Sequence, residues 1–237
     1  MLKSEVIPKI FPSMIMRGLV LALVAALFYA PLAQARQKAE DSELSKLQSA
    51  AKHGDSRAEL SLGTACHLGN GVKQDDVEAV KWWLKAADQG NPMAQLLVGN
   101  ALSEGKGIAK NDEKAVKWWR KAADQGDADA QNNLGTAYHN GMGVKKDAVE
   151  AVRWWQKAAE QGGIDVELSL GAAFYNGDGV PKDPVLAYMW FSLASAQDKQ
   201  AAAKLLDQVE ETMTQQQIVK AQGLAHQWTQ QHSALAH

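Results

Sequence analysis

Small and aromatic apolar residues recur along this chain with a period of 36 residues. The pattern is clearest in three near-identical copies of one sequence motif: Lys81–Gly90 (KWWLKAADQG), Lys117–Gly126 (KWWRKAADQG) and Arg153–Gly162 (RWWQKAAEQG). A fixed period in this range is typical of solenoids, in which one unit is too small to bury its own apolar face. We therefore divide residues 54–197 into four units, at 54–89, 90–125, 126–161 and 162–197.

Each unit predicts a pair of helices. In the first helix apolar residues recur at Ala130, Leu134, Ala137 and Tyr138, which is the spacing of an amphipathic helix. Asp and Asn are favoured N-caps. They open the first helices at Asp55, Asn91 and Asp127 (Gly163 holds this place in the fourth unit), and the second helices at Asp75, Asn111, Asp147 and Asp183. A Gly-x-Gly pair is expected to end each first helix, because glycine adopts a left-handed backbone easily.

The second helix predicts a buried stripe that contains a Trp pair, as in Ala151, Trp154, Trp155 and Ala158. An aromatic platform for a sugar or a base is the alternative interpretation of these pairs. Their helical spacing and flanking alanines favour the core for the first Trp, and they leave full burial of the second open. The glycines in register with Gly63 each cost about 1 kcal/mol against Ala inside a helix. We expect close helix contact to offset this cost.

The ends of the repeat array differ from its middle, as solenoid ends do. Residues 36–53 predict an N-terminal capping helix without a Trp pair. Residues 198–237 predict C-terminal capping helices, the last of which opens with the capping box Thr214-x-x-Gln217 and carries Trp228. We expect this last helix to cover the open end of the stack.

Residues 1–35 have the composition of a signal peptide. Basic residues precede an apolar run over residues 18–30, Pro31 breaks the run, and Ala33-Gln34-Ala35 supplies the pattern of a cleavage site between Ala35 and Arg36. Met14 and Met16 are alternative starts, since either leaves a compact signal. An uncleaved anchor is the competing interpretation, which the short run opposes because a spanning helix needs roughly 20 residues. We expect a periplasmic or secreted protein without stable membrane insertion after cleavage.

The charge of the chain argues against nucleic acid as a partner. The net charge is −2, and loss of three basic groups and one acidic group with residues 1–35 makes it −4. Phosphate binding needs a concentrated basic face. The lysines here alternate with acids, which is typical of a solvated surface.

Motifs for catalysis, cofactors or metals are missing from the sequence. His67 and His139 share a register but lie two repeats apart, too far to share one metal ion, so we expect solvent-exposed or peptide-contacting histidines. The Gly-x-Gly turns lack a third glycine and follow no predicted strand, so they are not a dinucleotide fingerprint. We predict no catalytic residues, no cofactor and no metal.

One unit of the repeat reads Ala130-x-x-x-Leu134-Gly135-x-x-Tyr138-x-x-Gly141-x-Gly143-Val144, followed by Asp147, Ala151-x-x-Trp154 and Lys157-Ala158-Ala159-x-x-Gly162. This pattern resembles the Sel-1-like repeat, a relative of the tetratricopeptide repeats. It implies an all-α fold, an αα-hairpin solenoid wound as a right-handed superhelix. It also implies a scaffold that holds proteins or peptides on a concave surface, in cell-envelope or host-interaction processes.

The same resemblance carries an alternative function. One cysteine-rich subgroup of the family is associated with β-lactamase or penicillin-binding activity, and it ties its hairpins with paired cysteines. This chain has only Cys66. We therefore expect a core thiol and no enzyme, and keep a peptidoglycan-active protein as the alternative.

The binding residues of a scaffold are expected where the copies differ on the inner face of the first helices. By register these residues are Asn100, Ser103, Thr136, His139 and Tyr175. The partner and the oligomeric state are left open by the sequence.

Overall fold

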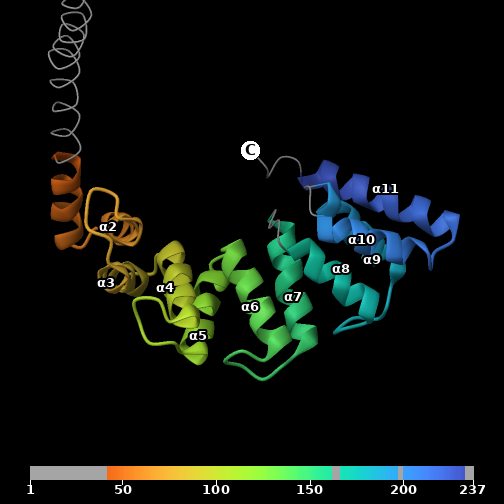
Figure 1. The fold of residues 1–237 in the computed structure, drawn as a ribbon, viewed down its shortest axis with the longest axis horizontal. Helices are drawn as coiled ribbons and strands as arrows, with labels where there is room; N and C mark the ends of the chain where they lie inside the picture. The colour runs from red at the N-terminus through yellow and green to blue at the C-terminus, as the bar shows by residue number, and fades with distance from the viewer. Residues whose placement is uncertain (1–41, 162–165, 197–199, 233–237) are drawn as a thin grey trace, which may run out of the picture.

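The structure is a computed structural model, and it describes residues 42–161, 166–196 and 200–232. Every regular element in these ranges is a helix, as predicted (Figure 1). A helix over residues 42–52 comes first. It is followed by α2 (Ser56–Leu68), α3 (Asp76–Asp88), α4 (Pro92–Glu104), α5 (Asp112–Asp124), α6 (Ala128–Asn140), α7 (Ala148–Glu160), α8 (Val166–Asn176), α9 (Pro184–Ser195), α10 (Gln200–Glu210) and α11 (Gln215–His232).

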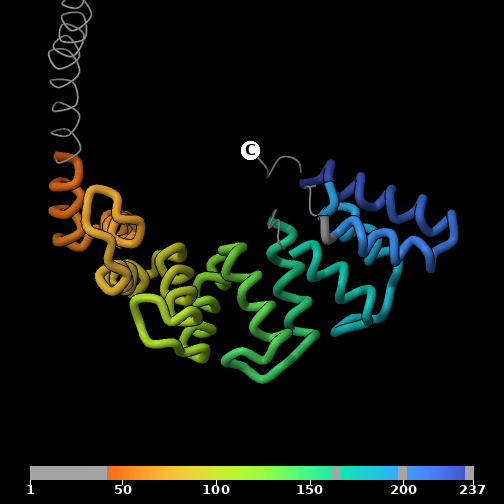
Figure 2. Tube along the Cα trace, viewed as in Figure 1, coloured from red at the N-terminus to blue at the C-terminus, as the bar shows by residue number. Residues whose placement is uncertain are grey.

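The helices pair into hairpins that stack in chain order. The pairs are α2 with α3, α4 with α5, α6 with α7 and α8 with α9, and each hairpin contacts the next through its second helix. The stack follows an arc, with the helix over residues 42–52 at one end and α11 at the other (Figure 2). Buried apolar residues run along the stack from the first hairpin to the last. The predicted αα-hairpin solenoid is confirmed.

Asp and Asn caps set the helix starts. The Asp127 side chain accepts a hydrogen bond from the Ala130 backbone N–H at 2.8 Å at the start of α6. At the start of α7, the Asp147 side chain accepts a hydrogen bond from the Glu150 backbone N–H at 3.0 Å. Asp55, Asn91, Asp75, Asn111 and Asp183 cap their helices in the same way. Gly141 ends α6 with φ at 74°, in the left-handed region. Gly163 lies outside the described residues.

One glycine in each first helix lies against an aromatic ring of the second. A Cβ added to Gly99 would lie 2.5 Å from Cδ1 of Trp119. The same contact joins Gly63 to Trp83, Gly135 to Trp155 and Gly171 to Phe191. The close helix contact expected at this register is therefore confirmed, and glycine is required for it.

The Trp pairs are oriented differently from what we expected. The second Trp of each pair, Trp83, Trp119 and Trp155, is buried against the glycine. The first Trp is only half-buried in the first two units, where Lys85 covers Trp82 and Lys121 covers Trp118 at 3.8 Å from each ring centroid. The expected order of burial is thus reversed in these two units, because the glycine lies opposite the second ring.

A ladder of carboxamide hydrogen bonds, in which Gln95 and Gln131 are the buried members, joins consecutive hairpins. Gln125 donates to Gln95 Oε1 at 2.8 Å, and Gln95 donates to the Ala87 carbonyl of the preceding unit at 3.1 Å. One repeat on, Gln161 donates to Gln131 at 2.7 Å and Gln131 to the Ala123 carbonyl at 3.1 Å. Each pair of Gln side chains therefore links the two helices of its own unit to the second helix of the unit before it.

The C-terminal helices pack on the last hairpin. Both α10 and α11 contact α9. The predicted capping box is present, since Gln217 Oε1 accepts from the Thr214 backbone N–H at 2.9 Å and Gln217 N–H donates to Thr214 Oγ1 at 3.3 Å. Trp228 meets Trp190 edge to face, with ring centroids 4.8 Å apart. In this way α11 covers the apolar side of α9.

The predicted signal peptide, its cleavage point and the first part of the N-terminal cap fall in residues 1–41, outside the described residues. None of the helices in the described ranges is long and apolar enough to cross a membrane.

Candidate functional site

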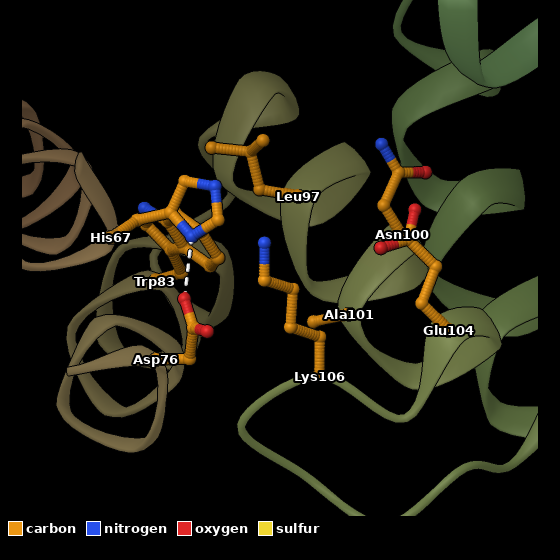
Figure 3. A pocket seen from close by; sticks show the side chains of 8 residues that line it. All are labelled: His67, Asp76, Trp83, Leu97, Asn100, Ala101, Glu104 and Lys106. Atoms are coloured by element: carbon orange, nitrogen blue, oxygen red, sulfur yellow. Dashed lines mark hydrogen bonds and ion pairs between the residues drawn. The ribbon is translucent and has the colours of Figure 1, made fainter. Parts of the chain in front are cut away.

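Two pockets lie between consecutive first helices. The first pocket, between the α2–α3 hairpin and α4, measures about 150 Å³ and is lined by His67, Asp76, Trp83, Leu97, Asn100, Ala101, Glu104 and Lys106 (Figure 3). The second pocket, between the α6–α7 hairpin and α8, measures about 380 Å³ and is lined by Thr136, His139, Asn140, Trp155, Leu168, Ser169, Ala172, Ala173, Asn176 and Asp178.

The two pockets are copies of one site, separated by two repeats. Every lining residue of the first pocket except Asp76 has its counterpart, 72 positions later, in the lining of the second. His67 corresponds to His139 and Trp83 to Trp155, and in both pairs the ring centroids of His and Trp are 5.4 Å apart. The repeat therefore builds a His–Trp pocket in alternate units.

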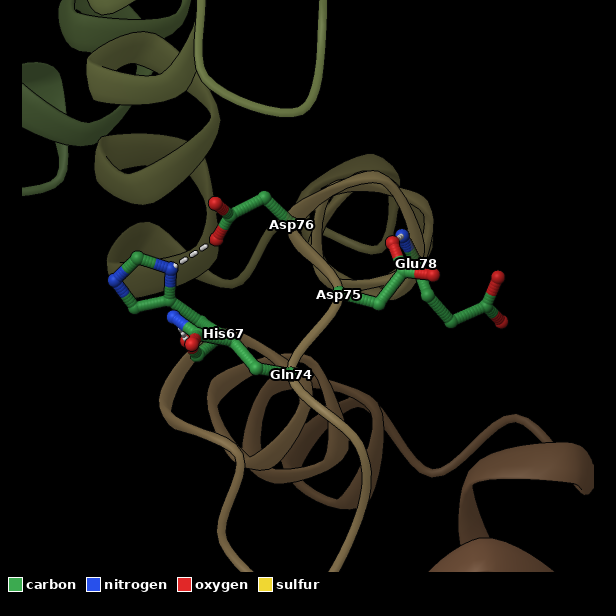
Figure 4. A network of polar contacts seen from close by, with 5 residues as sticks. All are labelled: His67, Gln74, Asp75, Asp76 and Glu78. Carbon is green, nitrogen blue, oxygen red and sulfur yellow. Dashed lines mark hydrogen bonds and ion pairs between the residues drawn. The ribbon is translucent and has the colours of Figure 1, made fainter.

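The two histidines differ in their polar partners. His67 Nδ1 lies 2.6 Å from Asp76 Oδ1, and the His67 carbonyl accepts from Gln74 Nε2 at 3.0 Å (Figure 4). A carboxylate only accepts, so Nδ1 carries a proton in this contact, and Nε2 of a neutral ring is left as an acceptor. Ala148 takes the place of Asp76 in the third unit, so His139 has no equivalent carboxylate.

The pockets bring together some of the predicted binding residues. Asn100 lines the first pocket, and Thr136 and His139 line the second. Ser103 and Tyr175 share the register of the two histidines but line neither pocket. Tyr175 is half-buried beneath Lys182, whose Nζ is 5.1 Å from the ring centroid.

At the equivalent position between the second and third units, side chains of the protein itself hydrogen-bond to one another. Trp119 Nε1 donates to Asn100 Oδ1 at 2.9 Å, and Asn133 Nδ2 donates to the same oxygen at 2.9 Å. In contrast, the buried Nε1 atoms of Trp83 and Trp155 have no hydrogen-bond partner among the described residues. The sequence analysis missed these indole N–H groups because it considered the Trp rings only as core or as an aromatic platform. The sequence does contain a signal for this difference, because Thr136 stands in the third unit at the register where the second unit has Asn100.

The chemistry of the remaining candidates is limited. Cys66 is only 7% exposed, and burial raises the pKa of its thiol, with Glu78 and Asp75 adding to the effect. A raised pKa keeps the thiol protonated and unreactive at neutral pH. Within the described ranges, no group of three or more His, Cys, Asp or Glu side chains is placed to hold a metal ion.

Comparisons with known proteins agree with the fold. None of the curated proteins compared with the chain matches it. It is similar to the crystal structure of a Sel1 repeat protein from Oxalobacter formigenes, at 33% identity and a TM-score of 0.65, over 76% of this chain and 74% of that one. It is also similar to c5321, a protective antigen of uropathogenic Escherichia coli strains that displays an SLR fold, at 31% identity and a TM-score of 0.54. That second match covers 78% of this chain and 47% of that one.

A model of the Sel1 repeat matches four stretches of the chain, residues 56–91, 92–127, 128–163 and 166–199. These stretches start two to four residues after the units defined from the 36-residue period. Together they cover more than half of the chain, which therefore belongs to the Sel1 repeat family.

Proposed function

We propose that this protein is an exported, non-enzymatic scaffold that binds a protein or peptide along the first helices of its solenoid. Sel1 repeat proteins generally act as protein-interaction scaffolds. One observation carries the proposal for this chain. The caps of the second helices and the glycines that face an aromatic ring repeat in every unit, whereas several of the residues that line the pockets between first helices change from unit to unit. Variable residues on a repeated structural framework can give specificity for one binding partner.

Export is the second part of the proposal. It is supported by the basic residues, apolar run and small-residue site within residues 1–35. The similar E. coli protein is a protective antigen. Cell fractionation followed by N-terminal sequencing tests this part. We expect the protein outside the cytoplasm with Arg36 as its first residue, and an intact N-terminus in the cytoplasmic fraction would contradict export.

Partner capture tests the scaffold. Tagged protein is used to recover binding proteins from a cell-envelope extract, which are then identified by mass spectrometry. We expect a small set of proteins that is lost when the predicted binding residues Asn100, Ser103, Thr136, His139 and Tyr175 are changed together to Ala. A control variant carries Lys81→Ala, Lys117→Ala and Arg153→Ala on the exposed side of the second helices.

Circular dichroism of both variants verifies that the helices remain folded. Capture that survives the five changes would show that the partner binds elsewhere. Recovery of no protein, together with hydrolysis of a chromogenic β-lactam by the purified chain, would overturn the scaffold in favour of an enzyme.

A further inference from the structure

The two His–Trp pockets carry opposite charges at one register of the repeat. Lys106 lines the first pocket, and Asp178, which follows it by 72 positions, lines the second. Met142 holds the register between them and is half-buried. All three are the middle residue of the Gly-x-Gly turn that ends a first helix. The same turn therefore brings a different side chain to each site along the stack.

The turn that presents this residue is held in place by close contacts. Gly177 and Gly179 both have positive φ values, 82° and 75°. A Cβ added to Gly179 would lie 2.2 Å from the Ala148 carbonyl oxygen at the start of α7. The Asp178 backbone N–H donates to the Ala173 carbonyl at 2.9 Å. The variable side chain is thus presented from a fixed backbone.

In the first pocket the chain supplies a cation of its own. Figure 3 shows the Lys106 side chain extending from its turn into the space between His67 and Asn100. The carboxylates of Asp76 and Glu104 line the same pocket, whose volume is only about 150 Å³. A lysine ammonium therefore has a place at this site when the chain itself provides it.

The second pocket has acceptors for a cation and, among the described residues, no lysine or arginine in its lining. Its volume is about 380 Å³. Its polar lining consists of hydroxyl, imidazole, carboxamide and carboxylate groups, from Thr136, His139, Asn140, Ser169, Asn176 and Asp178. Asp178 forms no ion pair within the described ranges. Its carboxylate is thus available to a cation from outside the chain.

The C-terminal ends of two helices add to the negative potential at this side of the pocket. Asn140 and Asn176 are the last residues of α6 and α8, and Asp178 follows two positions after the second of them. Aligned peptide dipoles leave about half a negative charge at a helix C-terminus, which favours a nearby cation. A ligand carboxylate would instead meet repulsion from Asp178 and from both helix ends.

The pocket also offers an apolar wall beside these acceptors. Leu168 and Ala172 are half-buried in its lining, two turns and one turn before Asn176 on α8. The eight positions from Leu168 to Asn176 correspond to about 12 Å of helix. Lysine and arginine bury their methylene stems along apolar surface and keep the charged end in a polar setting. The second pocket provides both environments within the length of such a side chain and its backbone.

We propose that the second pocket binds the side chain of a lysine or an arginine on the protein or peptide that the scaffold holds. Its stem lies along Leu168 and Ala172, and its charged end meets the Asp178 carboxylate. In the first pocket the chain's own Lys106 repels a second cation. The inference rests on the proposed scaffold function and names a side chain by which the partner is recognised.

Capped pentapeptides of the form acetyl-Gly-Gly-X-Gly-Gly-amide test the inference, with X as Lys, Arg, norleucine or Glu. They are titrated into ¹⁵N-labelled protein, and the backbone amide signals of Asn140, Asn176 and Asp178 are followed by NMR. We expect saturable shifts with the lysine or the arginine peptide. The norleucine peptide has the stem without the charge and should bind at least about fivefold more weakly. The signals of Gly105 and Gly107, which flank Lys106, should not move.

Three results with these peptides would overturn the inference. Equal affinity for the norleucine and lysine peptides would mean that the pocket binds an apolar stem and not a cation. The other two are the absence of a saturable response to both basic peptides, up to their solubility limit, and a response to the glutamate peptide alone. The ratio of the lysine and arginine affinities tells which of the two side chains the pocket takes.

Substitutions at Asp178 assign the binding to the pocket. Asp178→Asn should weaken binding of the basic peptide about two- to fivefold, the contribution of a partly exposed ion pair. Asp178→Lys copies the residue that the first pocket has at this register and should abolish binding. Asp129→Asn is the matched control, because Asp129 is an exposed acid of α6 outside the pocket lining. Equal weakening by Asp178→Asn and Asp129→Asn would show that only the net charge of the protein acts, and would contradict the pocket.

Partner capture with the Asp178→Lys variant separates this inference from the proposed function. Loss of both the peptide binding and the captured proteins, with capture by Asp129→Asn unchanged, supports the inference. Loss of the peptide binding with unchanged capture overturns it and leaves the scaffold standing. Binding of the basic peptide to a protein that captures nothing supports the pocket and contradicts the scaffold.

Discussion

At the scale of single residues, each hairpin is held together by contact between a glycine and an aromatic ring. In an isolated helix Gly99 is about 1 kcal/mol worse than Ala. In the folded chain its missing side chain admits the edge of Trp119, which is buried and cannot move aside without disturbing the core. Gly99 therefore lowers the helix propensity of α4, and the close packing of Trp119 requires it.

The change Gly99→Ala tests this contact. An added Cβ would lie 2.5 Å from Trp119 Cδ1, and overpacking of this kind costs about 1–3 kcal/mol. We expect a net loss of stability in urea denaturation, despite the better helix propensity of Ala. Gly223→Ala in α11 is the matched control, because nothing lies within 4 Å of the added atom, and it should stabilise by about 0.5–1 kcal/mol. Equal stabilisation by both changes would disprove the packing role of Gly99.

At the scale of the elements, the polar contacts between repeats are as regular as the apolar ones. Gln131 is buried in α6, where it accepts from Gln161 and donates to the Ala123 carbonyl at the end of α5. A fully satisfied buried network fixes the relative position of the groups that it joins. The ladder therefore sets how each hairpin docks on the one before it.

Replacement of Gln131 by Met removes both hydrogen bonds and keeps the length of the side chain. We expect Gln131→Met to lower the free energy of unfolding by about 1–3 kcal/mol, because the Gln161 amide and the Ala123 carbonyl each lose a partner. Gln227→Met, at an exposed position of α11, should change stability by less than about 0.5 kcal/mol. Indistinguishable midpoints for the two variants would show that the ladder contributes nothing to docking.

The sequence predicted the elements better than it predicted the site. The period and the caps located both helices of each unit, because Asp127, Asp147 and Gly141 act through local backbone geometry. The order of burial in the Trp pairs was missed because it depends on a glycine in another helix. The pockets were missed for a related reason. Side-chain length at positions 136 and 169 matters only once two repeats are stacked.

At the scale of the whole molecule, the principal contacts of each hairpin among the described residues are with its neighbours in the stack, and those of α10 and α11 are with α9. In such a quasi-one-dimensional protein, stability is a sum of unit and interface contributions, and damage at one end stays local. The end of the stack is closed by Trp228, which packs edge to face on Trp190 and stacks on His232 at 4.0 Å between centroids.

The substitution Trp228→Ala tests how far along the stack the loss of this side chain lowers stability. Trp228 is half-buried, so we expect Trp228→Ala to cost about 2 kcal/mol, below the 3–5 kcal/mol of a fully buried aromatic. Hydrogen exchange should accelerate in α8, α9 and α11 and remain unchanged in α2 to α5, because no principal contact links α11 to those hairpins. Lys220→Ala, at an exposed site of the same helix, should leave exchange unaltered throughout. Uniform acceleration from α2 onward would mean that the repeats unfold as one cooperative unit, and that binding at one pocket is felt at the other.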